Sequence, residues 1–239
     1  HVLLAKDVEM KASVAYSDKV AGKASQILLD GYRLWSEDAQ DVDRPHKVNK
    51  DFSLQSAQGE MIHGRYLYGM RKYGLAEQRV DRALELDPVL VPALTLKSML
   101  CLRKMEYQKA YEYANRALAV TEYDPEANYI SGQAAMKLGK VYDAMDRFEI
   151  AAITTDLRSA AYTRLAQIHF NCGDKELAED YARKSLIGNS YNVTAYRILY
   201  QICPSEDILS ELDRLDPLSH FADAERMLAG KITAEQLAE

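Results

Sequence analysis

The side chains that could perform acid–base or metal chemistry are scattered along this sequence. His63 and His169 fall within apolar stretches with helical spacing, where a hydrogen-bonded core or groove histidine is the expected role. Glu176, Glu179 and Asp180 cluster on one predicted helix face, where carboxylates keep a helix solvated. No GxGxxG, GKS/T, HExxH or GxSxG motif is present. We therefore expect no catalytic residues and no enzymatic activity.

The cysteines do not predict a disulfide framework or a metal centre. Cys101, Cys172 and Cys203 are odd in number, show no CxxC spacing and have no histidine cluster nearby. We expect them to be small apolar packing residues in three different helices, with no metal and no cofactor.

The charge and hydropathy of the chain argue against two classes of partner. The formal net charge is −6 and the pI is near 5.5, so there is no basic footprint for nucleic acid or anionic lipid. No apolar run approaches the ~18 residues of a membrane span. We expect neither nucleic acid nor membrane as a partner, and the compartment stays open between cytoplasm and periplasm.

The elements that position these side chains repeat along the chain. Ala76, Ala110, Ala144 and Ala178 are spaced by 34 residues. Two further columns keep the same phase: Ala83, Ala117, Ala151 and Ser185, and Gly64, Ser98, Gly132 and Ala166. Apolar residues between them have helical spacing, which predicts tightly paired antiparallel helices. We expect Gly132 to face an Ala of the next helix, and Gly139 to end its own helix in a left-handed conformation.

A 34-residue period with small residues at the eighth, twentieth and twenty-seventh places resembles the tetratricopeptide repeat (TPR) family. The resemblance implies an all-α, right-handed solenoid of helical hairpins. Four full repeats open at Ala57, Val91, Pro125 and Ser159, and a partial fifth opens at Val193. The predicted hairpins are 56–72 with 74–86, 92–105 with 107–120, 125–138 with 141–153, and 158–171 with 175–186. Helices over 193–203 and 208–215 and a last helix over 216–229 follow.

Three parts are predicted from this phase. Residues 51–203 form the repeat array, 204–239 form C-terminal capping helices, and 1–50 form an arm outside the repeat. In the arm, Asp30-Gly31 between apolar runs favours a β-hairpin over 26–35, and a helix over 20–35 is the alternative. The chain starts without Met and stops within a predicted helix, so we expect a fragment of a longer protein, with the arm as a possible tail of a preceding domain.

In TPR solenoids, one side of each first helix lines a concave groove. The resemblance implies that a partner contacts these residues: Arg65, Tyr68, Met99, Arg103, Tyr129, Gln133, Lys137, Gln167, Asn171, Arg197 and Gln201. Among them Gln133, Gln167 and Gln201 recur at the ninth place. Their amides, like the guanidinium groups, can pair with the backbone of an extended peptide. For Tyr68, Leu102, Met136 and Phe170, interior packing between repeats is an equal alternative.

The expected function is a non-catalytic scaffold that binds a peptide, a loop or a neighbouring domain of its parent chain. The pattern of Lys and Asn with which some TPR arrays clamp an acidic chaperone tail is absent. Residues 122–129, 158–162 and 216–222 also resemble the TPR region of large bacterial proteins that carry a β-sandwich domain of unknown function. That domain is related in appearance to carbohydrate-active proteins. The alternative is therefore an accessory region of a carbohydrate-active protein whose activity lies in a domain absent here.

Overall fold

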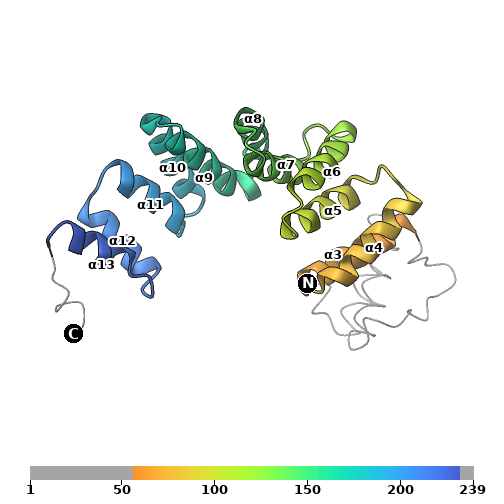
Figure 1. Cartoon of the computed structure of the whole chain (residues 1–239), viewed down its shortest axis with the longest axis horizontal. Helices are drawn as coiled ribbons and strands as arrows, with labels where there is room; N and C mark the ends of the chain where they lie inside the picture. The colour runs from red at the N-terminus through yellow and green to blue at the C-terminus, as the bar shows by residue number, and fades with distance from the viewer. Residues whose placement is uncertain (1–55, 232–239) are drawn as a thin grey trace, which may run out of the picture. The chain divides into compact units, whose positions relative to one another are not determined.

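The computed structural model describes residues 56–231, and all regular elements in this range are α-helices (Figure 1). The arm at 1–50, with its predicted hairpin, lies outside the described residues. The helices are α3 (Ala57–Gly69), α4 (Tyr73–Leu86), α5 (Val91–Arg103), α6 (Tyr107–Val120), α7 (Pro125–Lys137), α8 (Val141–Ala151), α9 (Thr155–Asn171), α10 (Lys175–Gly188), α11 (Val193–Ile202), α12 (Glu206–Leu215) and α13 (Phe221–Leu228). None of these described helices has the length and hydropathy of a membrane span.

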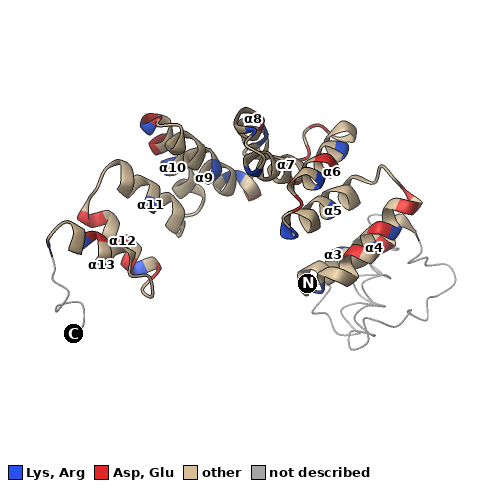
Figure 2. Ribbon diagram, viewed as in Figure 1, with Lys and Arg blue, Asp and Glu red and all other residues tan. Residues whose placement is uncertain are grey.

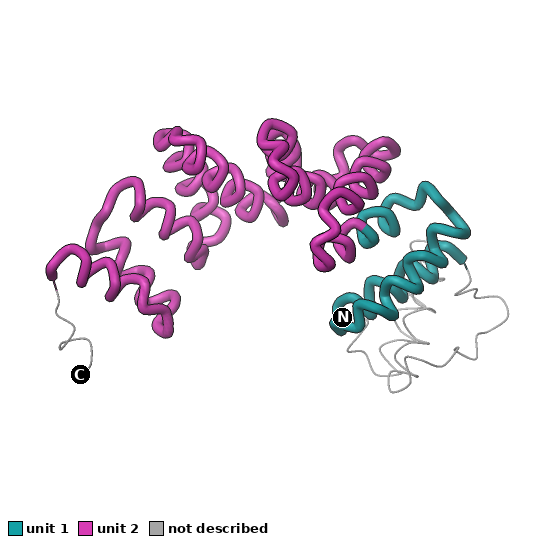
Figure 3. Tube along the Cα trace, in the orientation of Figure 1, with its two compact units in different colours: residues 1–97 teal, residues 98–239 magenta. Residues whose placement is uncertain are grey.

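Two compact units divide the chain, residues 1–97 and 98–239, with the boundary inside α5 (Figure 3). In the first unit, α3 packs against α4. In the second, each helix from α6 to α13 packs against the next, and the first helices α7, α9 and α11 also contact one another in order. The predicted limits of the array and its cap, 51–203 and 204–239, stay predictions.

The small residues of the 34-residue period form the contacts within each hairpin. Ala76, Ala110, Ala144 and Ala178 are all fully buried. The Ser98 hydroxyl donates to the Ala110 carbonyl at 2.6 Å, twelve residues along the same frame. At the equivalent Gly64, an added Cβ would lie 3.3 Å from the Ala76 carbonyl oxygen. Paired helices therefore approach closely where the eighth and twentieth places meet.

The expectation that Gly132 faces an Ala is wrong. A Cβ added at Gly132 would lie 2.9–3.0 Å from ring atoms of Phe148, a fully buried residue of α8. The missing side chain therefore makes room for an aromatic ring. Phe148 in turn belongs to a cluster with Ala144, Ala151 and Leu165, which joins the third repeat to the fourth.

The turn inside each hairpin has one recurring backbone conformation. The fifteenth residue of each frame has a positive φ: 61° at Arg71, 62° at Met105, 75° at Gly139 and 85° at Gly173. This confirms the left-handed end predicted at Gly139. In the first two repeats, a residue with a side chain adopts a conformation that glycine adopts at low cost.

Side-chain caps begin several of the helices. Asp124 accepts from the Ala127 amide at 2.7 Å, with Pro125 in the first helical turn. Asp174 accepts from the Leu177 amide at 3.2 Å. Both caps satisfy amides that have no partner within the helix, as the sequence predicts.

Two helix starts differ from the prediction. α9 begins at Thr155 rather than near 158, because the residues after α8 lack the Asp-Pro pair that separates other repeats. α13 begins at Phe221 rather than at Asp216, and the residues before it form a turn in which the Ser219 amide donates to the Asp216 carbonyl at 3.0 Å.

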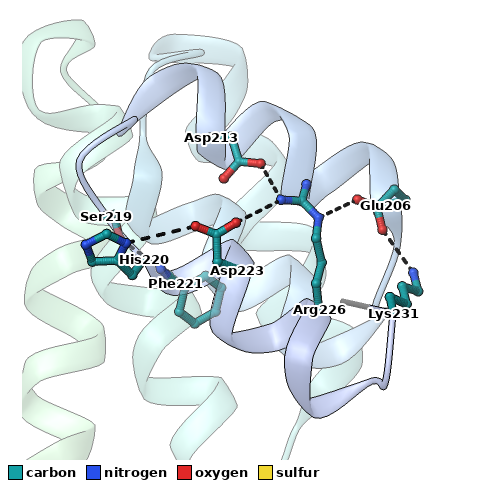
Figure 4. A network of polar contacts seen from close by, with 8 residues as sticks. All are labelled: Glu206, Asp213, Ser219, His220, Phe221, Asp223, Arg226 and Lys231. Carbon is teal, nitrogen blue, oxygen red and sulfur yellow. Dashed lines mark hydrogen bonds and ion pairs between the residues drawn. The ribbon is translucent and has the colours of Figure 1, made fainter. Parts of the chain in front are cut away.

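The last two helices are joined by an ion-pair network centred on Arg226 (Figure 4). Its guanidinium lies 2.8 Å from Glu206, 2.7 Å from Asp213 and 3.5 Å from Asp223. Lys231 adds a second contact to Glu206 at 2.9 Å. The network fixes α13 on α12 at the surface above the apolar contacts of Leu209, Leu212 and Ala222.

Candidate functional site

A cavity of about 510 Å³ lies in the second unit, at the C-terminal ends of three first helices, α5, α7 and α9. Because the repeats stack in phase, residues 34 apart on these helices meet at the same wall. Its lining residues are Leu102, Arg103, Met105, Tyr107, Gln133, Met136, Lys137, Arg164, Gln167 and Asn171.

Five of the residues that the sequence predicts at a partner-binding groove line this cavity. They are Arg103, Gln133, Lys137, Gln167 and Asn171. Gln133 and Gln167 share it, as their spacing of 34 residues predicts. Leu102 and Met136, for which interior packing was the alternative, line it as well. Met105, Tyr107 and Arg164 were not among the predicted residues.

The lining combines positive charge, amides and apolar surface. Arg103, Lys137 and Arg164 are cationic, and none of the described lining residues is Asp or Glu. Lys and Arg residues, blue in Figure 2, occur on each of the helices α5, α7 and α9. Such a surface can bind carboxylates and backbone carbonyls through charge-assisted hydrogen bonds.

Arg164 also orients one of the amides. Its guanidinium donates to the Gln167 side-chain oxygen at 3.1 Å. That contact uses the amide oxygen, so the NH₂ group of Gln167 is the part that can donate to a ligand.

A second cavity, of about 400 Å³, shares Arg164 with the first. Its other lining residues come from α7, from the start of α9 and from the segment around the start of α11. They are Tyr129, Thr155, Asp156, Ser159, Ala160, Thr163, Gly188, Asn189, Asn192 and Thr194. The predicted groove residue Tyr129 therefore lies here, with its ring against Phe148 at a centroid distance of 5.5 Å.

A hydroxyl and amide network forms one wall of the second cavity. Thr163 and Ser185 share a hydrogen bond of 2.8 Å between their hydroxyls, and Asn192 donates to them at 2.6 and 2.8 Å respectively. Ser159 donates to the Ser185 carbonyl at 2.9 Å. These polar groups satisfy one another, so the network holds α9, α10 and the start of α11 together.

The remaining predicted groove residues lie elsewhere. Arg65 is exposed on α3, and Tyr68 packs edge-on against Tyr73 at 5.3 Å, both within the first unit. Met99 is half-buried on α5 and Gln201 is exposed on α11, and neither lines the two cavities.

Arg197 contacts the C-terminal segment of its own chain. It donates to the Ser219 hydroxyl at 3.0 Å and lies 3.6 Å from the Asp216 carboxylate. Its guanidinium carbon is 5.1 Å from the centroid of the Phe221 ring. This predicted groove residue is therefore covered by residues 216–221.

Histidines and cysteines of the described range form no reactive cluster. No group of three or more His, Cys, Asp or Glu between 56 and 231 is placed to hold a metal ion. His169 is buried and stacks on Tyr181 at 5.4 Å, which fits the expected core role. Cys101 is buried as expected, but Cys172 and Cys203 are exposed at helix C-caps, so the packing role predicted for these two is wrong.

The fold and the sequence are both similar to known repeat proteins. Residues 159–186, within α9 and α10, match the family model of the tetratricopeptide repeat. Anaphase-promoting complex subunit 3 of Schizosaccharomyces pombe is 25% identical over 166 residues, which are 68% of this chain and 25% of that subunit. The chain thus spans a quarter of the length of this curated relative.

Two solved structures have the same fold. YrrB, a TPR protein with an unusual peptide-binding site, superposes with a TM-score of 0.60 at 16% identity, over 73% of this chain and 94% of YrrB. The APC/C hetero-tetramer Cut9–Hcn1 contains a chain that superposes with a TM-score of 0.69 at 13% identity, over 91% of this chain and 45% of that one. Together with the family match, they confirm the predicted fold class, an all-α solenoid of tetratricopeptide repeats.

Proposed function

We propose that this chain is a non-catalytic scaffold that binds an extended segment of a partner protein in the cavity formed by α5, α7 and α9. Tetratricopeptide-repeat proteins generally mediate protein–protein interactions. The observation that carries the proposal is the shared placement of Gln133 and Gln167 in a cavity whose other walls are cationic and apolar.

The chemistry of the lining suits a polypeptide in an extended conformation. Such a segment presents unpaired amide and carbonyl groups along its length, and a row of side-chain amides can pair with both kinds. The apolar residues Leu102, Met105 and Met136 offer contact to every second or third side chain of the ligand. Affinity is expected to be modest, because a flexible peptide loses conformational entropy when it binds.

The similar proteins support a protein partner. The Schizosaccharomyces pombe relative is a subunit of a multiprotein complex, and the Cut9–Hcn1 structure is a hetero-tetramer. YrrB is described as having a peptide-binding site. We extend these properties to the present chain as part of the proposal.

Selection from a random peptide library displayed on phage tests the function with the 239-residue chain as bait. Binding of the selected peptides is then measured by fluorescence anisotropy for the wild type and for Gln133→Ala/Gln167→Ala. We expect the double variant to lose at least about tenfold in affinity, which corresponds to ~1.4 kcal/mol. Gln78→Ala/Gln108→Ala, at exposed positions of α4 and α6, is the matched control. Peptides that both variants bind as the wild type does would contradict the proposal.

An accessory role in a larger carbohydrate-active protein is the second candidate. It is favoured by the resemblance of residues 122–129, 158–162 and 216–222 to the TPR region of large bacterial proteins with a β-sandwich domain. Glycoside hydrolysis by a longer chain that contains these 239 residues, and none by the 239 residues alone, is the expected result. Equal hydrolysis by the two chains would refute the accessory role.

A further inference from the structure

We propose that the segment bound by α5, α7 and α9 is acidic and carries an apolar side chain between its acidic residues. The inference rests on the proposed function and adds the class of partner. Four observations support it: the charge of the cavity, its spacing, its apolar wall, and a contact that the chain makes with itself.

The cavity concentrates positive charge in a protein that is negative overall. Arg103, Lys137 and Arg164 line it without a single Asp or Glu among the described lining residues, while the chain carries a net charge of −6. Lys137 and Arg164 form no ion pair with any carboxylate between residues 56 and 231. A ligand carboxylate in the cavity would therefore meet no repulsion from a neighbouring acidic residue.

Cations on an outer helix behave differently. On α10, Arg183 lies 2.7 Å from Glu179 and Lys184 lies 2.6 Å from Asp180. Each of these positive charges is balanced within its own helix. The contrast makes the cavity cations, rather than basic residues in general, the recognition element for an acidic ligand.

The spacing of the cations fits an extended chain. Arg103 and Lys137 occupy the same place in consecutive repeats, and Arg164 lies on the next first helix. Packed helices lie roughly 8–10 Å apart, and an extended chain advances about 3.3 Å per residue. Acidic residues about three positions apart would thus face successive first helices.

The same cavity has an apolar wall. Leu102, Met105, Tyr107 and Met136 lie beside the cations. Met105 is 73% exposed, so its flexible side chain can close on a ligand without leaving a packed core. An apolar side chain between two acidic ones would find this surface.

The chain binds a segment of this composition itself, at the fifth repeat. Arg197 occupies the place of Tyr129 and Thr163, two residues that line the second cavity. There it contacts the Asp216 carboxylate at 3.6 Å and the Phe221 ring at 5.1 Å. A basic residue on this side of a first helix thus receives an acidic residue and an apolar ring from one short segment.

The test reads the composition of ligands selected without bias. Random dodecapeptides displayed on phage are selected on the 239-residue chain, and the enriched sequences are synthesised together with versions in which Asn and Gln replace Asp and Glu. We expect enrichment of acidic residues around Leu, Ile, Met or Phe, and weaker binding at high ionic strength. Lys137→Glu/Arg164→Glu should lower the affinity by at least about tenfold, while Arg183→Glu/Lys184→Glu, which makes the same charge change on α10, should not.

The outcomes separate this inference from the proposed function. Peptides that depend on Gln133 and Gln167 but show no acidic bias would overturn the acidic class and leave the groove function standing. Equal weakening by the α10 variant would show a long-range effect of net charge and would also overturn the inference. Absence of any peptide that depends on the cavity residues would overturn both. Circular dichroism of each variant confirms that it is folded.

Discussion

Met105 and Gly139, separated by 34 residues, share one left-handed backbone conformation, with φ of 62° and 75°. Both follow the first helix of their hairpin by two residues. The conformation is required by the turn, since it recurs at Arg71 and Gly173. Only two of the four repeats have the residue type that adopts it without strain.

We predict that Gly139→Ala destabilises the protein and that Met105→Gly stabilises it. A Cβ at Gly139 would meet nothing within 4 Å, so the whole cost is conformational, about 1–2 kcal/mol. Met105→Gly removes the same strain, but Gly gains entropy in the unfolded chain, which leaves a net gain of roughly 0.5–1 kcal/mol. Urea denaturation followed by circular dichroism measures both. Equal midpoints for Gly139→Ala and the wild type would show that the turn tolerates a side chain.

The contact of Gly132 with Phe148 predicts a strongly non-additive pair of substitutions. Gly132→Ala places a methyl group 2.9–3.0 Å from the buried ring and should cost about 1–3 kcal/mol. Phe148→Leu shortens the side chain that the methyl group meets. In a double-mutant cycle, the two changes together should cost less than their sum, by about 0.5–3 kcal/mol. Additive costs would mean that the helices separate without regard to the ring.

The fold could be predicted from the sequence because each hairpin needs small residues where its helices touch. Ala76, Ala110, Ala144 and Ala178 are fully buried for that reason, and their phase is visible without coordinates. The partner of a small residue is less visible. Nothing in the local sequence distinguishes Phe148 from Ala144 as the residue that faces Gly132, since both lie on the same side of α8.

Helix starts were predicted well where a cap residue marks them and poorly where tertiary contacts decide. Asp124 and Asp174 cap their helices through their own side chains. Asp216-Pro217 has the same local signature, yet α13 begins at Phe221. Arg197, nineteen residues earlier in the chain, contacts both Asp216 and Ser219, and so favours a turn over a helix there.

The candidate site was predictable only as far as its repeat positions. Gln133 and Gln167 share a cavity because their helices stack in phase. Met105 and Tyr107 belong to the turn inside a hairpin and its next helix, which a list of first-helix positions omits. Arg164 reaches both cavities from the sixth place of its frame, and its contact with Gln167 depends on side-chain geometry that no spacing rule contains.

The closest helix contact of the third repeat predicts a severe effect of added volume. Ala144 is fully buried in a cluster with Phe148, Ala151 and Leu165. Ala144→Leu adds three carbon atoms there and should cost ~1–3 kcal/mol, because a packed crossing cannot expand without moving both helices. Ala119→Leu, at an exposed position of α6, is the matched control and should change stability little. An unchanged melting temperature for Ala144→Leu would contradict the placement of this residue.

The network at the C-terminal helices predicts a loss of local stability in acid. Hydrogen bonds from Lys231 and Arg226 hold the pKa of Glu206 below its ordinary value, because they favour the charged carboxylate. A depressed pKa in the folded state contributes stability that is fully present above the unfolded-state pKa and is lost as the pH falls through the folded-state pKa. Amide hydrogen exchange in α13 should therefore accelerate, beyond the intrinsic effect of pH, as the carboxylate is protonated. Glu206→Gln should show faster exchange already at neutral pH and should lose that extra acid dependence, while Asp207→Asn, its exposed neighbour, should keep it. If α13 exchanges alike in the wild type and in Glu206→Gln at every pH, then the apolar contacts of α13 hold it in place without the ion pairs.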